Sequence, residues 1–122
     1  IFPTILSYLN INLSEDVEIQ GRDIFELMKN QSESMYRSIY AQYSMRNFGK
    51  SDLRMIIKNQ LKLVKRFNLK AKGRFVDEFY NLNEDPEEKN NLIKDEKYFN
   101  KIAELENRLL SWMERINDEV VH

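Results

Sequence analysis

Residues 96–120 read EKYFNKIAELENRLLSWMERINDEV, and this stretch decides the fold. Its large apolar residues recur at spacings of three and four, which is the period of one face of an α-helix. The row consists of Tyr98, Ile102, Leu105, Leu109, Trp112 and Ile116, and it is widened by Phe99, Met113 and Val120. Burial of each such side chain contributes about 1.5–3 kcal/mol. We therefore expect a long C-terminal helix that packs its apolar face across a sheet.

Residues 53–67 permit two interpretations. Periodicity alone favours a helix, because the apolar residues fall on one helical face. The alternative is a β-hairpin with strands at 54–58 and 61–67 and a turn at Asn59-Gln60. Asparagine tolerates the positive φ that a two-residue hairpin turn requires. From the residues alone both structures stay open.

Two further segments are rich in aromatic and β-branched residues, MYRSIYAQY at 35–43 and FVDEFY at 75–80. Both predict strands. Asp85-Pro86-Glu87-Glu88 predicts a helix start, because aspartate caps, proline suits the first position and Glu88 completes a capping box.

Near the N-terminus the pattern predicts two short helices. Residues 1–9 carry apolar side chains at helical spacing, and Pro3 suits a first turn. Asp23 caps a second helix that begins at Ile24. No capping residue precedes Pro3, so we expect the chain to be cut from a longer one.

Composition excludes several classes of function. The net charge of −1 gives no field that would attract nucleic acid or an acidic membrane, and we predict neither as a partner. No apolar run approaches the length of a membrane span. The absence of cysteine removes thiolate nucleophiles and thiolate metal sites. The single histidine is His122, the last residue, so no Ser-His-Asp arrangement can be assembled. We predict no catalytic residue and no metal ligand in this chain.

Three charged or aromatic features could carry binding. An acidic cluster at 77–88 could hold a metal, but a capped helix start explains it better. A basic run at 54–74 could bind a polyanion, although the solvated face of a hairpin is the interpretation we favour. Trp112 could stack on a sugar, yet its place on the apolar row favours core packing.

Residues 78–92, EFYNLNEDPEEKNNL, resemble the C-terminal signature of the sulfatases. That signature has a Glu/aromatic-Tyr-(Asp/Asn)-Leu run, two variable residues, Asp-Pro, an acid and Asn-Leu. Other pieces resemble the family in the same order along the chain. They are residues 2–6, 21–25, 38–43, 54–58 with 61–64, and 109–113.

The resemblance implies an α+β fold within the alkaline-phosphatase superfamily. A small antiparallel sheet of about four strands would pack against the long C-terminal helix, with short N-terminal helices. It favours the hairpin for residues 53–67. It also implies that 1–30 is a truncated helical segment from a missing catalytic domain and 31–122 a C-terminal subdomain.

In arylsulfatase-like enzymes a Cys or Ser in Cys/Ser-x-Pro-x-Arg is oxidised to formylglycine, which acts beside calcium. The resemblance therefore implies these cofactors in a parent hydrolase of sulfate esters, and none in this chain. Here the prolines are Pro3 and Pro86, preceded two positions earlier by Ile1 and Glu84, so neither belongs to that motif. On this interpretation the chain alone is not an active enzyme.

The expected role of the subdomain is to buttress the large domain and to shape its substrate pocket. The basic loop at 44–54 suggests that Arg46, Lys50 or Arg54 meets an anionic substrate. Alternatives are a standalone α+β interaction module and a polyanion-binding domain. The 1–9 helix, separated from its neighbour, is expected to fray, repack or form a homodimer.

Overall fold

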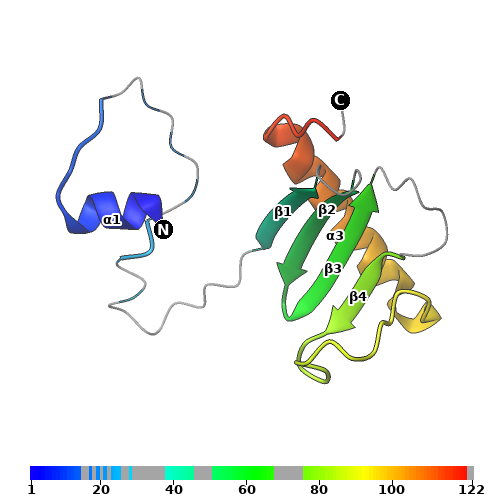
Figure 1. Ribbon diagram of the computed structural model, residues 1–122. Coiled ribbons are helices and arrows are strands. Elements are labelled where there is room, and N and C mark those ends of the chain that lie inside the picture. The colour runs from blue at the N-terminus through cyan, green and yellow to red at the C-terminus, as the bar shows by residue number, and fades with distance from the viewer. Residues whose placement is uncertain are drawn as a thin grey trace. The chain divides into compact units, whose positions relative to one another are not determined.

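The computed structural model describes residues 1–14, 17, 19, 21, 23–25, 28, 38–45, 51–67 and 76–120. The chain forms two compact units, Ile1–Met35 and Tyr36–His122 (Figure 1). Sequence had suggested a division between residues 30 and 31. No helix in the described part of the chain is both long and apolar enough to cross a membrane.

The first unit contains α1 (Phe2–Tyr8), which confirms the predicted helix at 1–9. Pro3 stands in its first turn, where its missing N–H costs no helical hydrogen bond. The backbone N–H of Ile24 donates to Thr4 Oγ1 at 3.1 Å, and the Tyr8 ring meets Phe25 edge-on at 5.7 Å. These two contacts join α1 to the segment near residue 24.

Asp23 caps a helical turn as predicted, because its carboxylate accepts a hydrogen bond from Phe25 N–H at 2.8 Å. Met28 N–H then donates to the carbonyl of Ile24, which closes a helical turn. None of the residues of α1 is buried.

In the second unit, four antiparallel strands form one sheet in the order β1-β2-β3-β4 (Figure 1). Their bounds are β1 Ile39–Met45, β2 Ser51–Lys58, β3 Leu61–Phe67 and β4 Glu78–Asn81. The predicted α+β class with a four-stranded antiparallel sheet is thereby confirmed.

β2 and β3 form the hairpin, so the helical interpretation of residues 53–67 is wrong. Asn59 and Gln60 have φ of 50° and 60°, the left-handed values that a type I′ turn demands of both central residues. The helix-like spacing arises because β2 is apolar on both faces. Ile56 points to one side and Leu53 to the other, which imitates a helical period.

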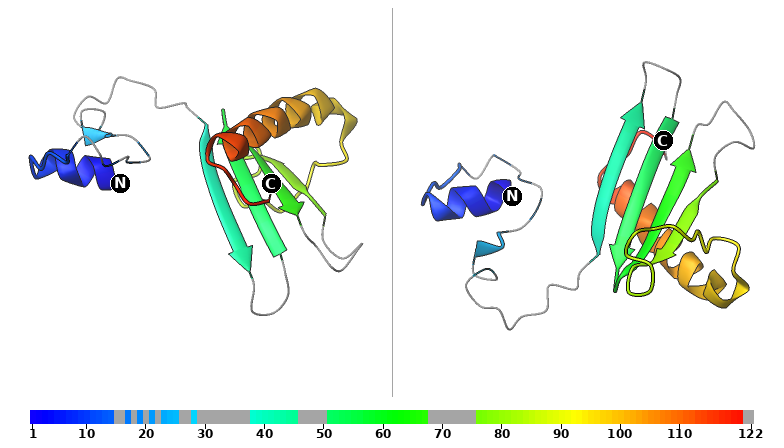
Figure 2. Two further views of the ribbon diagram at one scale, coloured as in Figure 1. Left: turned by 90° about the horizontal axis from the view of Figure 1, so that it is seen from above. Right: turned by 60° about the horizontal axis from the view of Figure 1, so that its bottom comes forward.

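The C-terminal helix begins as a 3₁₀ turn, Glu96–Tyr98, whose cap Asp95 accepts from Lys97 N–H at 3.0 Å. It continues as α3 (Phe99–Arg115), ending before the predicted residue 120. Asn117 has a left-handed φ of 51°, which turns the chain away from the helical path. α3 lies along one face of the sheet (Figure 2). The core consists of Leu105, Leu109 and Met113 from α3 against Ile56, Leu63 and Phe79 from the sheet.

The helix start predicted at Asp85-Pro86 is wrong. Asp85 accepts from Lys89 N–H at 3.0 Å and Asn90 N–H at 2.8 Å, and so closes a loop between β4 and the 3₁₀ turn. The hydrogen bond from Asn90 N–H is the main reason that the pKa of Asp85 lies below its usual value. An aspartate that accepts backbone N–H groups serves a helix or a loop equally well, which explains the error.

The face of the sheet opposite α3 is here called the far face. The strand register shows which residues lie on it. Strand alternation turns Leu53, Met55 and Ile57 of β2 away from Ile56, which packs on α3. Their cross-strand partners on β1 are Tyr43, Ala41 and Ile39.

Candidate functional site

Arg54 lies in β2, in a strand rather than a loop, and on the face that α3 covers. Its side chain is 2% exposed. The guanidinium forms a bidentate pair with Asp118: Nε donates to Oδ2 at 2.5 Å and Nη2 donates to Oδ1 at 2.7 Å. Planar two-point pairing is the strongest geometry available to an arginine and a carboxylate.

The remaining donor of Arg54 ties the pair to the ends of two strands. Nη1 donates to the carbonyl of Leu53 at 2.9 Å and to Tyr43 O and Ser44 Oγ at 3.3 Å each. One guanidinium thus joins the end of β1, the start of β2 and the segment after α3. Residues 46–50 connect those two strand ends and lie outside the described residues.

Asp118 is placed by the turn that ends α3. Its N–H donates to the carbonyl of Met113 at 2.9 Å, and its Oδ1 also accepts from Val120 N–H at 3.0 Å. The hydrogen bond to Asp118 raises the pKa of Arg54, and the same bond lowers the pKa of Asp118. Both groups are therefore held charged, as a buried pair must be to offset its desolvation.

An open hollow of about 490 Å³ lies beside this pair. Its lining is polar at the strand ends, with Gln42 and Ser44 from β1, and at the turn, with Asn117 and Glu119. The guanidinium of Arg54 is committed to Asp118 and to backbone carbonyls. The arrangement holds the end of β1 and the start of β2 together, and it leaves Arg54 no free fork for an anionic ligand.

Of the three site residues predicted from the sequence, the structure describes only Arg54. Arg46 and Lys50 lie outside the described residues. Arg54 is buried and positions its neighbours. Asp118, the buried partner of Arg54, was missed by sequence reasoning, because the pair spans 64 positions and Asp118 follows a helix whose end was predicted too late.

The basic run does not present free charge where it is described. Lys58 pairs with Glu104 at 2.8 Å, Lys62 with Glu88 at 2.6 Å, and Arg66 with Glu78. Lys65 contacts two acids, Asp77 at 2.7 Å and Glu106 at 2.8 Å. These pairs also use members of the acidic cluster. Lys70, Lys72 and Arg74 lie outside the described residues.

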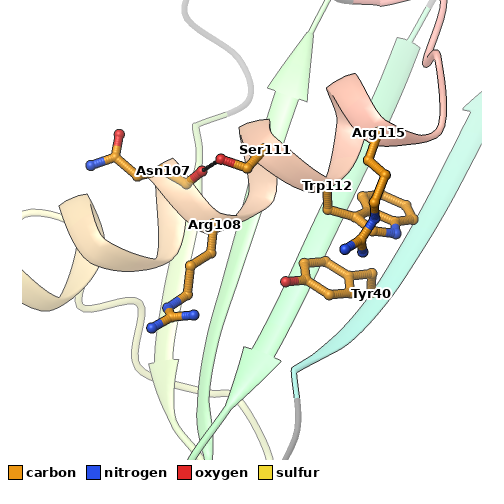
Figure 3. A pocket seen from close by; sticks show the side chains of 6 residues that line it. All are labelled: Tyr40, Asn107, Arg108, Ser111, Trp112 and Arg115. Carbon is orange, nitrogen blue, oxygen red and sulfur yellow. Dashed lines mark hydrogen bonds between the residues drawn. The ribbon is translucent and has the colours of Figure 1, made fainter.

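A second hollow, of about 340 Å³, lies between β1 and α3 (Figure 3). The rings of Tyr40 and Trp112 stack there, with centroids 4.8 Å apart and planes 9° from parallel. Arg108 and Arg115, which line the same hollow, extend from α3 (Figure 3). Trp112 packs against the core cluster, which agrees with the packing role expected from its place on the apolar row.

Comparison with known families gives a match over residues 1–115 to the family described as N-sulphoglucosamine sulphohydrolase, C-terminal. A search of the curated proteins found no match.

Among solved structures, similar chains include a proposed sulfatase from Bacteroides thetaiotaomicron VPI-5482 (22% identity, TM-score 0.78) and a 2-O GAG sulfatase (21%, 0.78). In both, the match covers 98% of this chain and 25% of the other. A third structure, solved in complex with its substrate D-glucosamine-2-N,6-O-disulfate, has 22% identity and a TM-score of 0.73, covering 96% of this chain and 24% of that one. The chain therefore spans about a quarter of the length of these structures, and at this identity the likeness establishes the fold.

Proposed function

The chain belongs to the N-sulphoglucosamine sulphohydrolase C-terminal family, and from that premise we propose that it is the non-catalytic C-terminal subdomain of a sulfatase. On this proposal a larger N-terminal domain hydrolyses sulfate esters, while this chain buttresses it and helps to shape its substrate pocket. The observation that carries the proposal is the family match over residues 1–115. The greater part of each similar structure lies outside the matched region, which leaves room for such a domain.

Formylglycine and calcium, which the family implies for the parent, do not fit the residues of this chain. Neither proline stands in Cys/Ser-x-Pro-x-Arg. Within the described ranges, no group of three or more His, Cys, Asp or Glu side chains is placed to hold a metal ion. We therefore assign both cofactors to the larger domain and derive no chemical step through them here.

The pocket-shaping part of the proposal concerns the connection between β1 and β2. Arg54, held by Asp118, joins the two strand ends that this connection links, and the connection contains the basic residues Arg46 and Lys50. We assign to them the contact with an anionic substrate, and we assign to Arg54 the positioning of the loop. Sulfated sugars are the first substrates to screen, because two of the similar structures are described with such substrates.

The test uses the longer gene product. Sequencing upstream of the Ile1 codon comes first, and an open reading frame that encodes Cys/Ser-x-Pro-x-Arg is the expected result. In that protein Lys50→Glu should raise KM for a sulfated sugar at least about tenfold, because a charge-assisted hydrogen bond contributes about 1.5–3 kcal/mol. Lys101→Glu on the exposed surface of α3 is the matched control and should leave KM unchanged. A start codon immediately before Ile1 would reject the enzyme proposal; unchanged KM in Lys50→Glu and Arg46→Glu would reject only the pocket role.

The polyanion-binding alternative has weaker support, since the described cations of the basic run are already paired with acids. Retention on heparin that falls steeply with salt would favour it.

Self-association through α1 stays a separate proposal. Phe2 and Ile5 of α1 and its C-cap residue Leu9 are 56%, 47% and 54% exposed. A dimer that Ile5→Glu dissociates, measured by sedimentation, would support it, and a monomer at all concentrations would contradict it.

A further inference from the structure

On β2 most of the charged side chains lie on the face that α3 covers, and the apolar side chains dominate the uncovered face. A sheet with one solvated face should have the reverse distribution. The face of β2 that α3 covers carries three charged residues, Asp52, Arg54 and Lys58, beside the core residue Ile56, whereas the far face carries Leu53, Met55 and Ile57. Antiparallel sheets with one wet face place apolar side chains inward and polar side chains outward. We infer that the far face of β1 and β2 is an interface, and that the larger domain of the parent protein covers it. This inference rests on the proposed function.

The apolar surface is continuous across the two strands. Its three cross-strand pairs are Ile39 with Ile57, Ala41 with Met55, and Tyr43 with Leu53, here called the apolar ladder. Directly opposed residues on one face of an antiparallel pair have Cβ atoms about 4.5–5.5 Å apart, so the six side chains form one patch. Ile39 and Tyr43 are each 59% exposed, and the three β2 members are half-buried. Burial of such side chains is the main source of stabilising free energy at an interface.

The other half of the far face has a different chemistry, which bounds the interface. On β3 and β4 it carries Lys62, Arg66 and Glu78, which are engaged in ion pairs, together with Val64 and Tyr80, which are buried. The outer surface of α3 is also polar, with Lys101, Glu104 and Arg108 exposed. Interfaces keep an apolar centre and a polar rim. The apolar ladder is the centre, and the ion-paired half of the far face belongs to the rim.

The larger domain is the occupant that these observations favour. In the similar structures a chain about four times as long contains the region equivalent to this one, so a covalently linked neighbour lies outside the match. A linked domain has a high effective concentration at the patch, whereas a second copy must be recruited from solution. Interfaces between domains of one chain need only about 600–1,500 Å², which an apolar patch of this kind can anchor.

The experiment uses thiol labelling, because the chain contains no cysteine. Ala41→Cys places a small probe at the middle of the apolar ladder, where the native side chain is exposed. Lys101→Cys places the matched control on α3, where the native side chain is 61% exposed. Each variant is prepared in the 122-residue chain and in the longer gene product. The rate of maleimide modification at the introduced site is measured by peptide mass spectrometry, so other cysteines of the longer protein do not interfere.

In the 122-residue chain both sites should react at similar rates. In the longer protein Ala41→Cys should react at least about tenfold more slowly, because a covered thiol reacts only when the interface opens. Lys101→Cys should react equally fast in both. Equal rates for Ala41→Cys in the two proteins would overturn the inference.

Two other outcomes would assign the patch to another occupant and would equally overturn the proposal. Protection in the 122-residue chain that grows with concentration would indicate a second copy. Protection there at every concentration would indicate residues 1–35 of the same chain. Labelling needs no activity, so it separates the two proposals: a parent without the sulfatase motif can still protect Ala41→Cys, and an active sulfatase can leave it exposed.

Discussion

Replacing Asp118 by alanine removes the bidentate partner of the buried guanidinium of Arg54. Breaking a buried ion pair in this way destabilises a protein by about 3–5 kcal/mol, because one charge stays buried without compensation. The two side chains here are 2% and 1% exposed, which puts the pair in that regime. Asp52, also buried and two residues before Arg54, offsets part of the stranded charge. We therefore expect a loss near the lower limit, about 3 kcal/mol.

Urea and thermal unfolding followed by circular dichroism would measure this loss in the 122-residue chain. A domain of this size shifts its Tm by about 4–8 °C per kcal/mol, so the Tm should fall by more than about 10 °C. Glu104→Ala is the matched control, because the Glu104 carboxylate is 41% exposed and its ion pairs with Lys58, Lys101 and Arg108 lie at the surface. Exposed pairs contribute about 0–1 kcal/mol.

A double variant at Arg54 and Asp118 tests whether the loss comes from the unpaired charge. Arg54→Met combined with Asp118→Leu removes both charges, and it should recover most of the stability that Asp118→Ala loses. If Asp118→Ala lowers the free energy of unfolding no more than Glu104→Ala does, the reasoning about this buried pair is refuted.

Three further predictions concern the same chain. The pKa of Asp118 is lowered in the folded state from an ordinary value of 3.8, so its contribution is fully present above pH 3.8 and is lost as pH falls through the folded pKa; the stability difference between the native chain and Asp118→Ala, followed by urea titration, should therefore stay constant above that pH and shrink below it. Gln60→Gly should stabilise the hairpin by about 0.5–1 kcal/mol, because Gln60 has a φ of 60° that glycine adopts without strain; a lower Tm would contradict the turn assignment. Leu109→Ala should destabilise the chain by about 2–5 kcal/mol, because Leu109 is 0% exposed in the core; a change below 1 kcal/mol in urea unfolding would show that α3 does not pack as described.

The sequence predicted the parts of the fold that depend on local pattern. The row of apolar residues at 98–116 has one meaning, because no strand spacing reproduces it. The hairpin was ambiguous because β2 is apolar on both faces, and only the family resemblance favoured it. The helix start predicted at Asp85 was wrong because an aspartate accepts backbone N–H groups in the same way at helix starts and in loops.

The candidate site was less predictable, for a physical reason. Arg54 looked like a surface cation because its burial depends on Asp118, a residue 64 positions away. Sequence periodicity reports which residues are buried together, but it does not report which charge is buried with which. The apolar ladder was not predicted either, because on β2 its residues alternate with Asp52, Arg54 and Ile56, which the fold turns toward α3.

The ion pair between Arg54 and Asp118 has a consequence for the order of assembly during synthesis. The β2–β3 hairpin joins neighbours in sequence and can form as soon as it leaves the ribosome, whereas the guanidinium of Arg54 must wait until residue 118 has emerged. Until then β2 carries a cation whose solvation has not yet been replaced, so α3 cannot close over the sheet without penalty. A nascent chain that stops between residues 115 and 118 would contain every strand and helix of this unit and still lack its closing contact. The pair can therefore form only after residue 118 has been synthesised.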